Sequence, residues 1–278
     1  MEDAIIEAIR LAVTKIPDDV VKSLQKAYEK ENSPTARFNL ENILNAIEIG
    51  EKEQIPVCQD TGTVTFFVEA GVRSPYLGVI KELITSALEK ATREIPLRPN
   101  TVDVLTNKNI GNFPIIHWEL VGGDKIKIAV LPKGGGSENC SALAMLTPAE
   151  GFEGVKQFVI ERVKECGGKP CPPIILGIGI GGSSDLALKL AKKALLRPIG
   201  KRHQDEKIAR FEEELLEEIN SLKIGPMGMG GKTTALDVKV EVAPRHPASF
   251  PVGIVFQCWA HRKAFLEINK DGEVRIWQ

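Results

Sequence analysis

Apolar residues recur with a helical period over the first 53 residues. Three stripes of apolar side chains repeat every three or four positions, and each predicts an amphipathic helix. The stripes are Ile5, Ile6, Ile9 and Val13; Val20, Val21, Leu24 and Tyr28; and Phe38, Leu40, Ile43, Leu44 and Ile47. Ser33-Pro34, before the third stripe, suits the cap and first turn of a helix. We therefore expect a helical lobe at about residues 1–53.

Strand and helix periods alternate over the next hundred residues. An apolar run at 64–68 predicts a strand, and the spacing after Ser74-Pro75 predicts a helix that ends before Pro96. The runs 115–120 and 126–131 flank a Gly-Gly-Asp turn, which predicts a β-hairpin. A further helix is expected over 152–165.

The second half of the chain continues this alternation. The run 174–180 has the composition of a buried strand, and it enters glycines and then a helix predicted over 184–196. A charged helix is expected over 203–222 with a solvated face. Strands at 236–242 and 252–259 follow, and the chain ends with a hairpin that joins 265–268 to 274–277 across Asp271-Gly272. We expect a mixed α/β fold in which helices flank mixed sheets, forming one domain over 1–278.

Charge and composition exclude several functional classes. The 36 basic and 37 acidic residues leave a net charge of -1, so no global field attracts nucleic acid or an anionic membrane. No apolar run approaches the length of a membrane span, and the N-terminus lacks the pattern of a signal peptide. These features predict a cytoplasmic globular protein.

The cysteines point to thiol chemistry. Five cysteines, an odd number, argue against a disulfide framework in a chain without an export signal. No CxxC pair occurs, so a zinc ribbon or a ferredoxin-type ligand loop is not supported. A metal site would have to be assembled by the fold from distant loops.

Two glycine-rich segments resemble nucleotide-binding motifs. Gly177-x-Gly179-x-x-Gly182 has dinucleotide-binding spacing, but the expected acidic residue about 20 positions later is missing. A nucleotide-binding protein that uses Gly177–Gly182 is therefore one alternative. The segment 228–234 imitates a phosphate loop, but Pro226 stands where the pattern requires its first glycine. This segment is either an anion-binding loop or a surface turn.

Two other loops carry candidate chemistry. Cys58 could bind metal and Asp60 could move a proton, and both directly precede the strand at 64–68; alone, however, such a pair is more often structural. The loop 133–139 contains three consecutive glycines, which allow either a flexible hairpin exit or close approach of the backbone to a ligand.

Taken together in order, five segments carry a family resemblance. They are Cys58-Gln59-Asp60-Thr61-Gly62, Leu97-Arg98-Pro99-Asn100, Lys133 to Asn139, Cys171-Pro172-Pro173 to Gly182, and His246 with Cys258-Trp259-Ala260-His261-Arg262. The chain resembles the class I, iron–sulfur fumarate hydratase and L-tartrate dehydratase family. The match is to the α subunit, which is equivalent to the N-terminal domain of the single-chain enzymes.

The resemblance implies a [4Fe–4S] cluster with three thiolate ligands, Cys58, Cys171 and Cys258. Cys140 and Cys166 fall outside the ligand positions. Three protein ligands leave one labile iron with open coordination, which can act as a Lewis acid on a substrate hydroxyl.

The resemblance also assigns roles to other residues. Asp60 is the implied acid/base, and His246 is implied to contact substrate or to set the protonation of Asp60. The implied substrate-binding residues are Gln59, Arg98, Gly134, Gly135 and Gly136. Arginine can clamp a carboxylate bidentately, and glycine N–H groups can bind carboxylate oxygens.

The implied activity is reversible hydration of a small dicarboxylate, with fumarate to (S)-malate as the first expectation. L-tartrate dehydration is the alternative within the family, and a non-catalytic iron–sulfur scaffold subunit is an alternative from another class. The family completes its site with a further domain, so the resemblance implies a separate β subunit, in an α2β2 assembly.

Overall fold

The computed structural model describes residues 1–278, and the chain forms two compact units built from separate segments. Unit 1 comprises Met1–Pro17, Ala46–Gly135 and Arg262–Gln278, and unit 2 comprises Asp18–Asn45 and Gly136–His261. Both contain a β-sheet with helices, which confirms the mixed α/β class. The single domain with a helical lobe at 1–53 stays a prediction. No helix combines the length and apolar character needed to cross a lipid bilayer.

The predicted N-terminal helices are all present. They are α1 (Glu2–Thr14), α2 (Asp18–Lys30) and α3 (Pro34–Glu53). The first stripe is buried along α1, as amphipathic spacing requires. Ser33 caps α3, because its Oγ accepts the N–H of Ala36 at 3.4 Å. Phe38 is the exception in its stripe, since it remains 63% exposed on α3.

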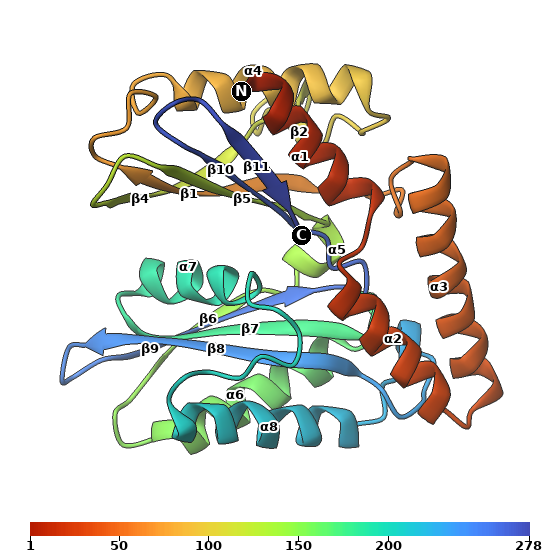
Figure 1. Ribbon diagram of the computed structural model, residues 1–278. Coiled ribbons are helices and arrows are strands. Elements are labelled where there is room, and N and C mark those ends of the chain that lie inside the picture. Colours follow the sequence, from red (N-terminus) through yellow and green to blue (C-terminus); the bar gives the residue numbers. More distant parts are fainter. The chain divides into compact units, whose positions relative to one another are not determined.

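Unit 1 contains a five-stranded sheet in the order β11-β10-β5-β1-β4. The strands are β1 (Thr63–Gly71), β4 (Ile115–Val121), β5 (Ile126–Lys133), β10 (Ala264–Ile268) and β11 (Val274–Trp277). Helices α1 and α4 (Ile80–Glu94) cover one face of this sheet (Figure 1), and apolar side chains from the sheet and the two helices form one core. A small pair, β2 (Thr101–Val102) and β3 (Asn109–Gly111), lies outside the sheet.

The predicted hairpin between 115–120 and 126–131 is wrong. Both segments are strands, but β1 lies between them and pairs with β4 in parallel and with β5 antiparallel. The Gly-Gly-Asp turn instead lies against the end of β1, where a Cβ on Gly71 would come within 2.7 Å of the Gly123 carbonyl oxygen. The C-terminal hairpin of β10 and β11 is confirmed.

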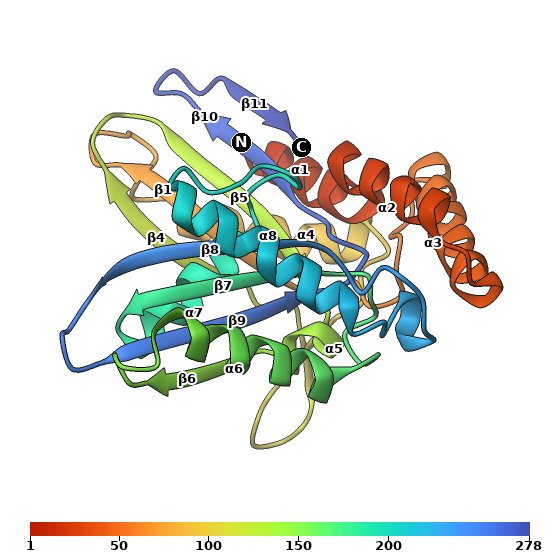
Figure 2. The same ribbon diagram turned by 90° about the horizontal axis from the view of Figure 1, so that it is seen from below.

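Unit 2 contains a four-stranded sheet in the order β6-β9-β7-β8. The strands are β6 (Ala142–Leu146), β7 (Ile174–Gly182), β8 (Ala235–Arg245) and β9 (Phe250–Gln257). Helix α7 (Ser184–Ala194) covers one face, while α6 (Gly151–Cys166) and α8 (Glu206–Ser221) cover the other (Figures 1 and 2). A short helix, α5 (Gly135–Glu138), precedes β6, and a 3-10 turn, η1 (Pro226–Gly228), precedes β8.

The glycines with dinucleotide-like spacing are explained by the packing of α7. A Cβ on Gly177 would lie 2.0 Å from the carbonyl oxygen of Ala191, and a Cβ on Gly179 would lie 2.0 Å from that of Ala187. Gly253 on the neighbouring strand also meets the Ala187 backbone, at 2.7 Å. The spacing therefore serves helix–sheet contact, which requires residues without a side chain.

The segment that imitates a phosphate loop is attached to the α2–α3 turn. The buried Glu31 carboxylate accepts the N–H of Lys232 at 2.6 Å and that of Ser33 at 3.0 Å. Burial raises the pKa of Glu31, but the N–H groups of Ser33, Lys232 and Asn32 outweigh it and lower the pKa below its ordinary value. Lys232 Nζ donates to the carbonyl of Lys30 at 2.8 Å. The Glu31 carboxylate thus already accepts the Lys232 N–H, a hydrogen-bond donor that a bound phosphate would need.

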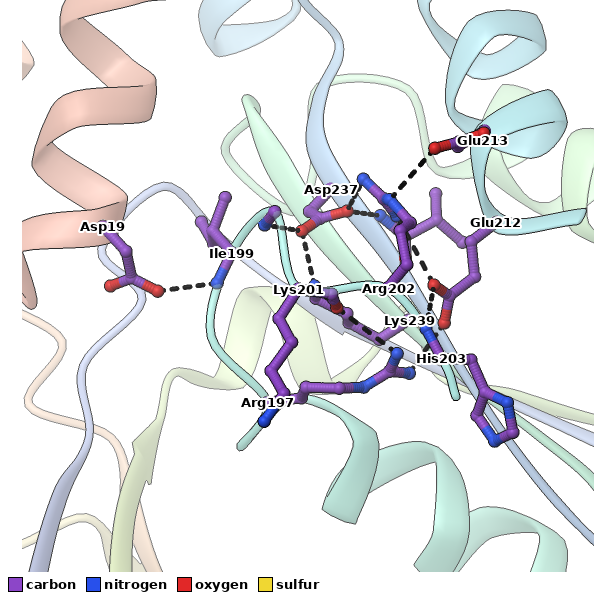
Figure 3. A network of polar contacts seen from close by, with 12 residues as sticks. Asp19, Arg197, Ile199, Lys201, Arg202, His203, Glu212, Glu213, Asp237 and Lys239 are labelled. Atoms are coloured by element: carbon purple, nitrogen blue, oxygen red, sulfur yellow. Dashed lines mark hydrogen bonds and ion pairs between the residues drawn. The ribbon is translucent and has the colours of Figure 1, made fainter. Parts of the chain in front are cut away.

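A buried ionic network fixes the connection between α7 and α8 (Figure 3). Glu212 on α8 and Asp237 and Lys239 on β8 are fully buried. Glu212 Oε1 accepts from Arg197 Nη2 at 2.7 Å, and Asp237 pairs with Lys239 Nζ at 2.7 Å and Arg202 Nη2 at 2.8 Å. Burial lowers the pKa of Lys239, and the Asp237 carboxylate opposes that shift.

Backbone groups complete this network. Glu212 also accepts the N–H of Val240 at 2.8 Å and of His203 at 3.1 Å, and Asp237 accepts the N–H of Gly200 at 2.7 Å. The N–H of Ile199 donates to Asp19 on α2 at 2.6 Å. Each buried carboxylate therefore has several donors, which is the condition under which buried charge is tolerated.

Glu212→Gln should destabilise the protein, because it removes the negative charge that compensates Arg197 and Arg202 in a buried site. We expect the free energy of unfolding to fall by about 3 kcal/mol, as for other broken buried pairs. Urea unfolding followed by circular dichroism measures this. The matched control is Glu213→Gln, since Glu213 is the exposed neighbour and should change stability by less than about 0.5 kcal/mol. Equal effects of the two substitutions would contradict a structural role for the network.

Candidate active site

The Asp60 carboxylate is held by two backbone N–H groups at the start of β1. Its Oδ1 accepts the N–H of Gly62 at 3.0 Å, and its Oδ2 accepts the N–H of Gly135 at 2.8 Å. Gly62 has a φ of +80°, and a Cβ there would lie 2.7 Å from the Lys133 backbone. Only glycine allows this contact between the loop before β1 and the end of β5.

The loop 133–139 approaches Asp60 through its glycines. A Cβ on Gly134 would lie 2.8 Å from Asp60 Oδ2, so a side chain at this position would displace the carboxylate. The family resemblance implies that the N–H groups of Gly134, Gly135 and Gly136 bind a substrate carboxylate. In the structure the Gly135 N–H donates to Asp60 itself. Gly136 belongs to unit 2, where its Cβ position lies 3.2 Å from the Lys169 carbonyl oxygen.

Thr61 connects the Asp60 loop to the segment that carries Arg98. The buried Thr61 Oγ1 accepts the backbone N–H of Arg98 at 3.0 Å and Nδ2 of Asn100 at 3.1 Å. Asn100 Nδ2 also donates to the carbonyl of Gly62 at 3.1 Å. The sequence assigns no role to Thr61 or Asn100, and the signal that could have found them is their position in two of the ordered motifs.

The Asp60 loop and the Arg98 segment border a cavity of about 350 Å³ within unit 1. Its lining residues are Gln59, Asp60, Thr63, Arg98, Asn100 and Gly135. The cavity combines one cation, one carboxylate and two side-chain amides, and its volume is in the range of small-molecule sites. The structure thus brings together Gln59, Asp60, Arg98 and Gly135 from the predicted set.

Arg262 contacts the backbone of the Asp60 loop. The sequence alone did not indicate a functional role for this residue. The side chain is 1% exposed, and its Nη2 donates to the backbone carbonyl of Asp60 at 2.9 Å. Nε and Nη1 are buried without a hydrogen-bond partner. A buried guanidinium is costly, so its placement beside Asp60 indicates that the loop depends on it.

The three predicted cluster thiols are divided between the units. Cys58 lies in unit 1, next to Gln59 and Asp60, whereas Cys171 and Cys258 lie in unit 2. In unit 2 the N–H of Trp259 donates to the carbonyl of Cys171 at 3.2 Å, which joins the two cysteine loops. All three cysteines are half-buried, and none is in a disulfide. Neither unit gathers three histidine, cysteine or carboxylate side chains into a group that could hold a metal ion.

The other two cysteines are buried in the core of unit 2. Cys166 Sγ donates to the carbonyl of Cys140 at 3.9 Å. Burial, together with the contact with Cys140, raises the pKa of the Cys166 thiol to about 12. Metal ligation requires the thiolate, and this environment favours the protonated thiol. The exclusion of Cys166 from the ligand set stays a prediction.

His246 lies on the connection from β8 to β9 in unit 2. Its side chain is exposed, and Nδ1 accepts the N–H of Ala248 at 3.1 Å. Arg245 braces this turn by donating to the carbonyl groups of His246, Pro247 and Ser249. Because Nδ1 accepts, the neutral ring carries its proton on Nε2. His246 does not line the unit 1 cavity, and its predicted role with Asp60 stays a prediction.

Comparison with known proteins decides the family. A family model described as fumarate hydratase matches residues 2–267. The chain belongs to this family. It is 50% identical to a protein of Methanocaldococcus jannaschii provisionally named L(+)-tartrate dehydratase subunit alpha, over 99% of both chains. It is 38% identical to Escherichia coli proteins named L(+)-tartrate dehydratase subunit alpha, over 93% of this chain and 87% of theirs. The resemblance predicted from the ordered motifs is confirmed.

Arg262→Met should loosen the Asp60 loop of this family member while leaving the rest of unit 1 intact. Loss of a hydrogen bond from a charged donor should raise local amide exchange by about 10- to 100-fold. Hydrogen exchange measured by mass spectrometry on peptides that cover Gly62 and Gly135 tests this. Arg275→Met is the matched control, because Arg275 is exposed on β11. Unchanged exchange around Asp60 in Arg262→Met would show that Arg262 does not position the loop.

Proposed function

We propose that this chain is the α subunit of a hydro-lyase that reversibly hydrates a small dicarboxylate, with fumarate and (S)-malate as the substrate pair. The observation that carries the proposal is the Asp60 carboxylate, held by the N–H groups of Gly62 and Gly135 in the wall of a cavity that Arg98 shares. A fixed carboxylate can transfer a proton, and a guanidinium can bind a substrate carboxylate bidentately. L-tartrate is a second candidate substrate, because the similar proteins carry the name L(+)-tartrate dehydratase.

The residues of the cavity have different proposed roles. Arg98 binds one substrate carboxylate, and the amides of Gln59 and Asn100 orient the rest of the molecule by hydrogen bonds. Asp60 carries the proton that is exchanged with substrate through its carboxylate oxygens. The role proposed for His246 is to contact substrate or to set the protonation of Asp60. Gly135 lines the cavity and acts through Asp60, while the substrate contacts assigned to Gly134 and Gly136 stay part of the proposal.

The thiols fit a [4Fe–4S] cluster by their chemistry. Cys58, Cys171 and Cys258 are half-buried thiols outside any disulfide, and the two in unit 2 lie on loops joined by the Trp259 N–H. We propose that these three hold the cluster and leave one labile iron. When bound, the cluster supplies a Lewis acid that polarises the substrate hydroxyl. Such thiolates need a reducing compartment, which favours a cytoplasmic location.

A separate β subunit completes the proposed enzyme. The similar proteins are named as alpha subunits, and the cavity of unit 1 offers one cation, Arg98, for a substrate with two carboxylates. We propose that the second polypeptide supplies further cationic contacts in an α2β2 assembly. Two other functions have less support. The glycines of the segment Gly177–Gly182 contact α7, which weakens the case for a nucleotide-binding protein. A non-catalytic cluster scaffold would not require the Asp60 cavity.

The activity is tested on the chain co-expressed with its β subunit and purified without oxygen. We expect turnover of fumarate or L-tartrate by the complex and negligible turnover by the isolated chain. Asp60→Asn should lower kcat by about 100-fold or more, because proton transfer is lost. Asp271→Asn, on the exposed β10–β11 turn, is the control. Full activity of Asp60→Asn, or of the isolated chain, would refute the assigned role or the need for a partner.

The cluster is tested independently of activity. Anaerobic reconstitution of the chain should give about four irons and visible absorption typical of an iron–sulfur protein. Cys58→Ser should prevent cluster retention, whereas Cys166→Ser should keep it, because the Cys166 thiol is buried and protonated. Equal loss of iron and sulfide in both variants would overturn the ligand assignment.

A further inference from the structure

An arm formed by β2, β3 and their connection exposes an unusual number of apolar side chains. Residues 101–113 make up this arm, and Val104 and Leu105 at its tip are 93% and 94% exposed. Its other exposed apolar side chains are those of Val102, Ile110 and Phe113. Single exposed apolar residues are ordinary, but a concentration on one projection marks an interaction surface.

The tip of the arm is held in one conformation. Asp103 Oδ1 accepts both the N–H and the hydroxyl of Thr106 at 2.7 Å, and the Asp103 carbonyl accepts the N–H of Asn107 at 2.8 Å. The N–H of Asp103 donates to the carbonyl of Lys108 at 2.9 Å. Val104 and Leu105 are therefore presented to solvent by a closed turn, which lowers the entropy lost when a partner binds them.

The base of the arm shares hydrogen bonds with the wall of the cavity. Asn112 Oδ1 accepts the N–H of Asn100 at 2.9 Å, and Asn112 Nδ2 donates to the carbonyl of Arg98 at 3.0 Å. Asn109 Nδ2 donates to the carbonyl of Pro99 at 2.6 Å. The segment that carries Arg98 is thus fixed from one side by Thr61 and from the other by the arm.

The apolar surface continues from the arm onto an edge strand. β4 follows the arm directly and is the last strand of the unit 1 sheet. Ile115 and Leu120 on β4 are 37% and 65% exposed. An edge strand with apolar side chains is a surface that proteins normally cover.

We propose that the arm and β4 form the docking surface for the β subunit, and that docking there positions Arg98 for substrate. This inference rests on the proposed function, because it takes the partner to be the polypeptide that completes the cavity. The similar proteins are named as one kind of subunit, which requires a second kind. The occupant presents an apolar groove that receives Val104 and Leu105 at its centre.

A second copy of this chain is the less suitable occupant. A convex apolar tip needs a concave apolar receptor on the other molecule. The three cavities described on this chain are lined mainly by charged residues, amides and glycine. Charged and amide linings match an apolar tip poorly, and the subunit names of the similar proteins favour a different polypeptide as the occupant.

The test compares two double variants for binding to the purified β polypeptide. Val104→Ser/Leu105→Ser should weaken the Kd, measured by isothermal titration calorimetry, by about 30-fold or more, as expected for interface hot spots. Ile49→Ser/Val79→Ser is the matched control, because both residues are about half exposed in unit 1, outside the arm and β4, and should leave the Kd unchanged. Both variants remove only exposed side chains, and thermal unfolding confirms that each is folded.

A second substitution tests the connection to Arg98. In the complex, Asn112→Ala should raise KM more than it lowers kcat, because it releases the Arg98 segment without removing a group that touches substrate. An unchanged KM would overturn the connection.

The outcomes separate the two proposals. The docking inference is overturned if the arm variant binds the β polypeptide as tightly as the wild type does. It is also overturned if the wild-type chain does not bind the β polypeptide at all. A third contradicting result is an isolated wild-type chain that is dimeric together with an arm variant that is monomeric, because the occupant of the surface would then be a second copy of this chain. A complex that depends on the arm but hydrates neither fumarate nor L-tartrate supports docking and refutes the proposed function.

Discussion

The contact between the Asp60 carboxylate and the Gly62 and Gly135 N–H groups is the constraint on which the candidate site depends. It joins the residues before β1 to those after β5, and these two strands pair antiparallel along the middle of the unit 1 sheet. The sheet therefore brings the acid and the glycines together, and the missing side chains of Gly62 and Gly134 leave the space for them. Arg98 enters the same cavity because Thr61, inside the loop, accepts its backbone N–H.

Glycine serves close approach within the chain at each of its three conspicuous motifs. Helix α7 lies on Gly177 and Gly179. A Cβ on Gly231 would lie 2.8 Å from Glu31 Oε2, which accepts the N–H of Lys232, and Asp60 Oδ2 accepts the N–H of Gly135. In the last two cases a carboxylate of the protein accepts a backbone donor that sequence motifs assign to a ligand. The chemistry of an anion-binding loop is present in both, but the anion is internal. At the Asp60 loop this arrangement borders a cavity that Arg98 shares, which makes the loop a candidate site and not a structural tether alone.

The buried charged residues also fall into two groups, one with a structural role and one beside the candidate site. Glu212, Asp237 and Lys239 are surrounded by opposite charges and backbone groups, so their network is fully explained by holding the α7–α8 connection. Arg262 has one acceptor, the Asp60 carbonyl, and two buried nitrogens without partners. Incomplete pairing of a buried cation next to a proposed proton-transfer group is the pattern expected where a protein retains a costly charge for function.

Local pattern in the sequence determined the helices, most of the strands and the membership of the family, because periodicity and short motifs are properties of neighbouring residues. The ordered motifs also indicated Gln59, Asp60 and Arg98, which the structure places around one cavity. Tertiary structure alone decided that β1 inserts between β4 and β5, since a turn that could close a hairpin does not reveal a third strand from 50 residues earlier. It alone decided that Gly135 serves Asp60 and that Arg262 supports the loop, because both contacts join segments far apart in the chain. Their partners are set by strand pairing and packing, which no local pattern encodes.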